Sequence, residues 1–346
     1  MTPLNPGRLI RNIIAPVLIL AVILVVFFRN LTPADILANF RRIPPGYVIA
    51  FILLSLVGTV LRSWQYHVLL AGKLRFRDTF LITLVRNFSV DLLPGRTASL
   101  VFYSWLTKKK GIALEEGASS FVISVFYDSI ALSLMLGGLL FFFETGMSRW
   151  PFLAAMAALF AVSALVLFLS RPFLQFLLKG NKLRRLRLGR IEGTVLAVCA
   201  YLSAHGRFAE RLKLLGISFA SRLCKYIYNF ILFEGVLHLG ISLKNFSLFC
   251  FGLAATEISS MLPIHGPAGF GTWELAFSLI FSALRVPAEN IKEAGFVIHI
   301  TSQAWEYAIG LLALTYLAFG RGRRQSPVPR NGAMDRPTGP GPSRCR

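Results

Sequence analysis

The sequence predicts an all-α polytopic membrane protein with about six full spans and two interrupted or re-entrant helical hairpins in an inverted-topology repeat. Three observations predict this class. The chain of 346 residues is 55% hydrophobic and only 15% charged. Several of its apolar runs have the length of about 20 residues that a helix needs to cross the hydrocarbon of a membrane. A formal net charge of +21 lies in short clusters between these runs, which excludes a soluble nucleic-acid binder. Two further apolar stretches are broken by proline and glycine.

Six apolar runs predict the full spans. They lie near residues 10–28, 47–71, 117–143, 150–170, 214–239 and 294–319. The first run follows Arg8 and Arg11, as in a secretory signal. It ends without a small-residue cleavage site, so we expect this span to be retained.

Two segments between the spans contain helix-breaking residues. Pro94 and Gly95 interrupt residues 78–107, and a stretch from Pro263 to Gly271 interrupts residues 244–285. Lipid cannot hydrogen-bond a freed backbone amide, so such breaks must be buried in protein or line a polar cavity. The arms of the first segment, roughly 16 and 11 residues, are too short to span, whereas the first arm of the second could cross alone. Re-entrant hairpins are favoured, and two full spans are the alternative.

The order of the elements predicts the domain organisation. Span, span, interruption and span in residues 1–145 recur in residues 146–319 from the opposite side, and the positive-inside rule places both termini in the cytoplasm. Residues 171–213 form a basic cytoplasmic linker, which either recognises anionic lipid or, as we favour, only sets the topology. Residues 320–346 are rich in Pro, Gly and Arg and are expected to be a disordered basic tail.

The first break carries candidate anion-binding residues. An arginine at membrane depth is costly and usually faces a cavity or an anion. Arg96 follows Pro94 and Gly95 directly, beside the free amides that begin the next arm. We expect Arg96, with Arg86, to bind the phosphate of a lipid head group. Asp91 lies in the same cluster, five residues after Arg86 and poorly placed to pair with it on one helix face. The alternative for the arginines is an internal ion pair that only stabilises the break.

The second break carries glycines and carboxylates. Gly269 and Gly271 permit a close backbone approach, while Glu257 and Glu274 flank the break. These carboxylates are candidates for binding a cationic head group or carrying a proton. The alternative for Glu274 is that it accepts hydrogen bonds from the free amides of the break.

Other ionisable residues lie inside apolar spans, where opposite charges can neutralise one another within a bundle. Asp128 is deep in its span and is expected to be functional. Arg62 lies near the end of its span and is expected to snorkel to the surface. The remaining four are Arg222, Lys225, Glu234 and Glu306. His299 is expected to be a satisfied buried histidine.

No catalytic signature occurs in the sequence. It has no phosphate-binding glycine loop, two-histidine zinc helix or nucleophile elbow, and its four cysteines show no paired or metal-like spacing. We therefore expect no enzyme activity, no cofactor and no metal site.

The broken segments resemble hallmarks of the lysylphosphatidylglycerol synthase transmembrane region family, also described as flippase-like membrane proteins. The first is Asn87 followed by Leu93-Pro94-Gly95-Arg96 and, downstream, Asp128; the second is Pro267-Ala268-Gly269-Phe270-Gly271 followed by Glu274. The sequence Leu61-Arg62-Ser63-Trp64 resembles a further pattern of the family. The family's Gly-Glu after the arginine and its Glu-Arg before the aspartate are replaced by Ala98-Ser99 and Val125-Phe126.

The resemblance implies lipid translocation in the bacterial plasma (inner) membrane by a stand-alone member without the soluble aminoacyl-transferase domain. The leading hypothesis is a flippase-like transporter that moves a phosphate-bearing lipid between leaflets. The alternative is a non-transporting accessory protein that binds or presents a lipid to an envelope lipid-modifying enzyme. In both cases the partners are membrane lipids and not nucleic acid. The expected substrate-binding residues are Arg86, Asn87, Asp91, Pro94, Gly95, Arg96, Asp128, Glu257, Gly269, Gly271 and Glu274.

Overall fold

The computed structural model describes residues 38, 41, 43–92, 96–143, 148–178, 208–259, 271–286 and 291–319. This part of the chain is helical and contains no strand, so the predicted all-α class is confirmed. The predicted first span, residues 10–28, and the predicted tail, residues 320–346, lie outside the described residues. In chain order the helices are α4 (Pro45–Leu69), α5 (Phe76–Leu92), α6 (Arg96–Lys109), α7 (Leu114–Leu139) with the 3-10 turn η2 (Leu140–Phe142), α8 (Trp150–Leu178), α11 (Phe208–Leu237), α12 (Leu243–Ser259), α13 (Thr272–Ala283) and α14 (Ile291–Phe319).

Three stretches of the described chain are long and apolar enough to cross a membrane: Pro45–Leu69, Leu114–Phe142 and Trp150–Leu167. The helices α11 and α14 are as long, at 30 and 29 residues, but they carry more polar and charged side chains. The protein is therefore a multi-pass membrane protein. The count of six full spans stays a prediction.

Helices extend into both ends of the predicted basic linker, residues 171–213. α8 continues to Leu178 and α11 begins at Phe208. The part of α8 beyond residue 171 is mostly apolar, and the first turns of α11 contain the good helix formers Ala209, Glu210, Arg211 and Lys213.

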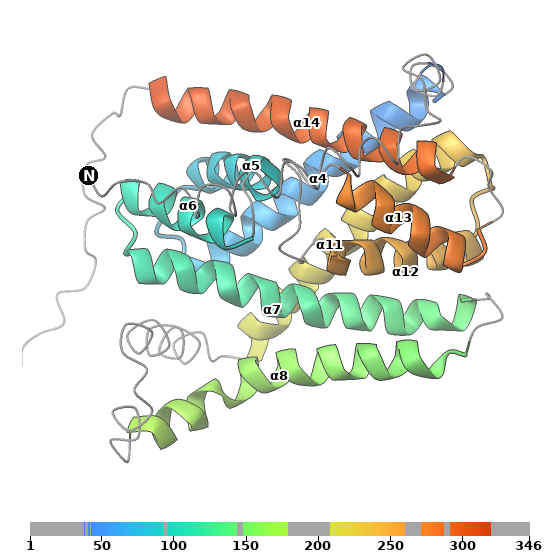
Figure 1. Ribbon diagram of the computed structural model, residues 1–346. Coiled ribbons are helices and arrows are strands. Elements are labelled where there is room, and N and C mark those ends of the chain that lie inside the picture. The colour runs from blue at the N-terminus through green and yellow to red at the C-terminus, as the bar shows by residue number, and fades with distance from the viewer. Residues whose placement is uncertain are drawn as a thin grey trace, which may run out of the picture.

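Each predicted interruption separates two helices. α5 and α6 flank residues 93–95, and α12 and α13 flank residues 260–270. The four helices contain 17, 14, 17 and 12 residues. At about 1.5 Å per residue, each is about 18 to 25 Å long and shorter than about 30 Å of hydrocarbon. Figure 1 shows α5 and α6 at one end of the molecule, and α12 and α13 at the other.

The long helices frame these shorter pairs (Figure 1). α4 packs along α11, α7 lies between α8 and α11, and α14 packs on α5 and α13. Two hydrophobic cores result. One contains Phe233, Phe249, Phe277 and Phe281, from α11, α12 and α13. The other contains Tyr66, Tyr103 and Phe121, from α4, α6 and α7. Each broken segment thus has a core of its own.

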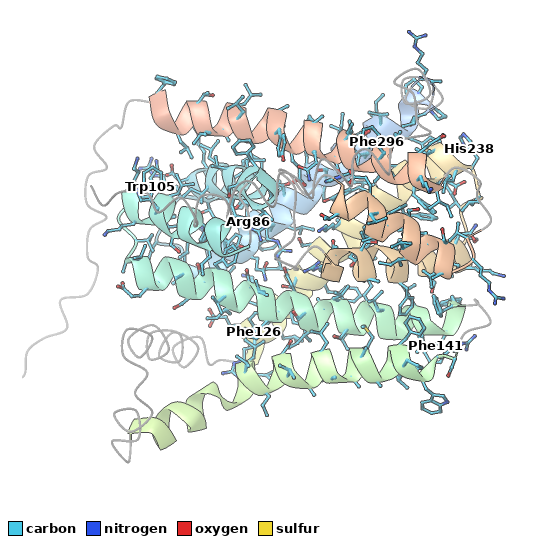
Figure 2. The ribbon with its side chains drawn as sticks, in the orientation of Figure 1. Arg86, Trp105, Phe126, Phe141, His238 and Phe296 are labelled. Carbon is cyan, nitrogen blue, oxygen red and sulfur yellow. The ribbon has the colours of Figure 1, made fainter. Side chains whose placement is uncertain are left out.

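Two ion pairs lie at the end of the molecule that contains α5 and α6. Lys73 Nζ lies 2.7 Å from Glu116 Oε1, and Lys110 Nζ lies 2.8 Å from Asp78 Oδ1. These contacts join the chain after α4, the start of α5, the chain after α6 and the start of α7. The start of α5 and the end of α6 therefore lie close together. Figure 2 shows Trp105 at this end and Phe141 and His238 at the opposite end, with Arg86 between them.

Candidate functional site

Asp128 lies near the middle of α7 and forms a short ion pair with Arg62 of α4. Arg62 Nη1 donates to Asp128 Oδ1 at 2.7 Å and also contacts Gln65 Oε1 at 2.6 Å. Gln65 in turn donates to Ser218 Oγ of α11 at 2.5 Å. The Arg62 and Asp128 side chains are only 12% and 8% exposed. The expectation that Arg62 snorkels is wrong, because a buried carboxylate on the neighbouring helix satisfies its guanidinium.

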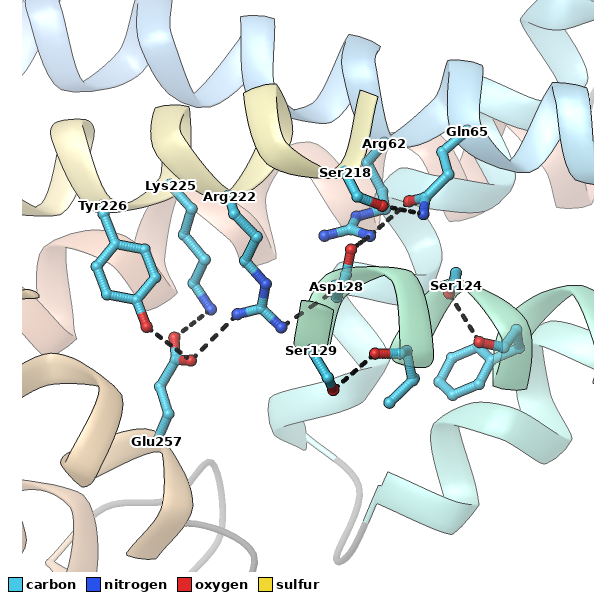
Figure 3. Close-up of polar contacts among 12 residues, drawn as sticks. Arg62, Gln65, Ser124, Asp128, Ser129, Ser218, Arg222, Lys225, Tyr226 and Glu257 are labelled. Carbon is cyan, nitrogen blue, oxygen red and sulfur yellow. Dashed lines mark hydrogen bonds and ion pairs between the residues drawn. The ribbon is translucent and has the colours of Figure 1, made fainter. Parts of the chain in front are cut away.

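Arg222 of α11 connects Asp128 to a second carboxylate, Glu257 of α12 (Figure 3). Its Nη2 lies 3.6 Å from Asp128 Oδ2, and its Nη1 donates to Glu257 Oε2 at 3.3 Å. Lys225 Nζ lies 2.6 Å from Glu257 Oε1. The Tyr226 hydroxyl donates to Glu257 Oε2 at 3.5 Å. The expectation that opposite charges pair within the bundle is confirmed for these residues.

We refer to Arg62, Asp128, Arg222, Lys225 and Glu257 as the charged cluster. Its residues belong to α4, α7, α11 and α12. Three cations face two carboxylates, so these five side chains carry a formal charge of +1. The cluster is costly to bury unless its charges are balanced, and an excess of positive charge favours an anion nearby.

Arg86 of α5 adds further positive charge beside the cluster. It lies close enough to Asp128 to interact with it electrostatically. Its Nη1 donates to Asn87 Oδ1 at 3.1 Å, and its guanidinium lies 5.2 Å from the centre of the Phe121 ring. Its Nε is buried and has no hydrogen-bond partner in the described part of the chain. The Arg86 guanidinium thus lies against α7, the helix that carries Asp128.

Glu274 lies in a separate buried contact at the start of α13. Its Oε2 accepts a hydrogen bond from the Gly271 amide at 2.7 Å, and its Oε1 lies 2.5 Å from His299 Nδ1. Gly271 has a φ of 85°, which favours glycine. Glu274 therefore satisfies an amide at the break, as the alternative interpretation expected, and His299 is a satisfied buried histidine. A role for Glu274 in substrate binding stays a prediction.

Several predicted site residues cannot be placed in this geometry. Pro94, Gly95 and Gly269 lie outside the described residues, as do the side chains of Asp91 and Arg96. The backbone puts Asp91 at the end of α5 and Arg96 at the start of α6. Their roles stay predictions.

The sequence analysis named Arg222 and Lys225 only as ionisable residues within spans and did not place them among the expected site residues. A signal was present, because these two residues are three apart on one helix and therefore share a face. Gln65 and Ser218 gave no signal, because uncharged polar residues are common in membrane helices. In the described part of the chain, no group of three or more His, Cys, Asp or Glu side chains is arranged to hold a metal ion.

Comparison with known proteins accounts for most of the chain. The sequence family described as Lysylphosphatidylglycerol synthase TM region matches residues 13–310. A search of the curated proteins finds no match. The matched range contains both breaks and every residue of the charged cluster. The chain therefore belongs to the lysylphosphatidylglycerol synthase TM region family.

Proposed function

We propose that this protein is a lipid flippase-like transporter that moves a phosphate-bearing lipid between the leaflets of the bacterial plasma membrane. The observation that carries the proposal is the charged cluster, in which Asp128 and Arg222 lie near the middle of long helices. Ionisable side chains at such positions are expensive and usually mark a substrate or ion pathway. The excess of cations over carboxylates matches a phosphate.

The two broken segments are proposed to be re-entrant hairpins that enter from opposite sides. Their short arms and their positions at opposite ends of the molecule support this arrangement (Figure 1). The packing also supports an inverted repeat, because α4 packs on its counterpart α11, and α5 and α12 pack on α14 and α7, the last helices of the opposite halves. Transporters of this type hold their substrate near the midplane between the repeats.

The head group would pass the charged cluster while the acyl chains remain in the bilayer. In this proposal Arg86 and Arg96 attract the phosphate, with Asn87, Asp91, Pro94 and Gly95 shaping the first break around it. Asp128 and Glu257 balance charge, and Gly269, Gly271 and Glu274 shape the second break. Polar and charged side chains along the path lower the free-energy cost of moving a charged head group across the hydrocarbon.

The test is lipid movement in vesicles that contain only the purified protein. Fluorescent phosphatidylglycerol that has moved to the inner leaflet escapes an added quencher, so the quenched fraction reports exchange between leaflets. We expect Asp128→Asn to slow this exchange by about ten-fold or more, because Arg62 and Arg222 lose their shared counter-charge. The matched control is Ser129→Ala, since Ser129 Oγ only donates to the Val125 carbonyl of its own helix.

The outcomes separate the two candidate functions. Exchange above that of protein-free vesicles supports the transporter. Tight binding of phosphatidylglycerol without exchange supports instead an accessory protein that presents a lipid to another enzyme.

A further inference from the structure

We propose that Arg222 is the anion-binding residue of the charged cluster. In this proposal its guanidinium exchanges two protein carboxylates for the phosphate of a lipid head group, while Arg62 and Lys225 keep Asp128 and Glu257 neutralised. The inference rests on the proposed function for the nature of the ligand. It adds which cation receives the phosphate and which cations only hold the carboxylates.

The distances within the cluster are unequal. Each carboxylate has one close cation: Arg62 lies 2.7 Å from Asp128, and Lys225 lies 2.6 Å from Glu257. Such short charge-assisted contacts are the strong ones. Arg222 is 3.6 Å from the first carboxylate and 3.3 Å from the second. Its separation from Asp128 is too long for a hydrogen bond, so Arg222 is the most weakly held cation of the three.

Arg222 also has N–H donors that are available for a further ligand. A guanidinium carries five N–H donors in a planar fork, and the hydrogen bond that Arg222 makes to a carboxylate runs from Nη1 to Glu257. Its Nε is buried without a hydrogen-bond partner among the described residues. A phosphate presents two oxygens that match Nε and one Nη in a bidentate contact. Arg222 can therefore gain hydrogen bonds by turning from the carboxylates to a phosphate.

The release of Arg222 leaves no carboxylate without a counter-charge. Asp128 keeps Arg62, which is itself held by Gln65, and Glu257 keeps Lys225. Breaking a buried pair is costly only when a charge is left uncompensated. Arg222 is thus the one cation of the cluster whose exchange leaves both short pairs intact. Its side chain is 16% exposed.

The experiment measures lipid binding by native mass spectrometry on the full chain in a maltoside detergent, which contains no phosphate. The probes are phosphatidylglycerol, diacylglycerol with the same acyl chains, and inorganic phosphate as a competitor. We expect the protein to retain phosphatidylglycerol and not diacylglycerol. Arg222→Gln should weaken retention by about ten-fold or more, because a bidentate charged contact is lost. Arg77→Gln, at an exposed contact with Tyr316, is the matched control and should bind within about two-fold of wild type.

A second pair of variants protects the test against misfolding. Arg222→Lys keeps the charge but loses the planar fork of donors, whereas Arg62→Lys disturbs a residue that pairs with Asp128 and contacts Gln65. We expect Arg222→Lys to weaken phosphatidylglycerol retention more than Arg62→Lys does. Equal retention by Arg222→Gln and wild type, stronger weakening by Arg62→Lys than by Arg222→Lys, or equal retention of diacylglycerol would each overturn the proposal.

The phosphate competition shows whether the phosphate group alone or the whole lipid is recognised. The vesicle assay separates this inference from the proposed transport function. Displacement of the lipid by inorganic phosphate shows that the phosphate group alone is recognised. Retention against phosphate shows that the whole lipid is recognised, and both results support the exchange. Arg222-dependent binding without lipid movement in vesicles leaves the inference standing while the transporter fails. Lipid movement with unchanged binding by Arg222→Gln rejects the inference alone.

Discussion

Arg62 and Asp128 join α4 to α7 through a 2.7 Å ion pair whose two side chains are only 12% and 8% exposed. Both charges are largely shielded from solvent, so the short contact between them is their main stabilisation. Arg222, on a third helix, α11, lies near the same carboxylate. Asp128 thus lies beside cations from two other helices of the bundle.

The first prediction concerns the stability that Asp128 provides. Asp128→Ala leaves the buried Arg62 guanidinium without a carboxylate and removes one of the two carboxylates beside Arg222, so it should cost about 3 to 5 kcal/mol. The comparison is Asp78→Ala, which removes the 2.8 Å ion pair with Lys110, whose lysine and aspartate side chains are 31% and 15% exposed. That change should cost at most about 1 kcal/mol. The measurement is unfolding of the purified variants in mixed detergent micelles, and equal losses would contradict the prediction.

A second prediction concerns the close approach of α12 and α13. A Cβ atom on Gly252 would lie 2.5 Å from Cζ of Phe281, which is fully buried. Gly252→Ala should therefore destabilise the protein by about 1 to 3 kcal/mol through overpacking. Gly216 of α11 is the matched control, because nothing lies within 4 Å of its Cβ position. Gly216→Ala should be neutral or stabilising by about 1 kcal/mol.

Phe281→Leu in the Gly252→Ala background checks the cause. The smaller side chain makes room for the new methyl group, so the double variant should lose less stability than the two single losses added together. A strictly additive loss would show that Gly252 is needed for a reason other than this contact.

The sequence predicted the helices better than it predicted the site. Long apolar runs fix where α4, α7 and α8 lie, and proline and glycine mark the breaks beside α5 and α13. The sequence also identified Asp128 and Glu257 as exceptional, because a carboxylate in an apolar run is costly. It did not reveal that Arg222 lies between them, because the pairing depends on how α11 packs against α7 and α12. The same dependence made Arg62 look like a residue that reaches the surface.

The third prediction separates the two contacts of Glu274. Glu274→Gln keeps an oxygen that accepts from the Gly271 amide but replaces the carboxylate beside His299. Glu274→Ala removes both contacts and leaves buried polar groups unsatisfied. We expect Glu274→Ala to cost about 1 to 3 kcal/mol more than Glu274→Gln in thermal unfolding. Equal losses would show that the His299 contact, and not the cap of α13, carries the stability.

The last prediction concerns the turn after α4, where the chain leaves the bundle towards α5. Ala71 has a φ of 50°, a left-handed conformation that costs about 1 kcal/mol for a residue with a Cβ. Helices commonly end on a glycine in this conformation, and here the glycine is the next residue, Gly72, with a φ of 68°. Ala71→Gly should therefore raise the stability by about 0.5 to 1 kcal/mol, net of the extra freedom of glycine in the unfolded chain. Gly72→Ala should lower it by a similar amount, because the same backbone strain then appears at the second position. Thermal unfolding of both variants decides the matter: opposite shifts of the midpoint support strain at this turn, while shifts in the same direction reject it.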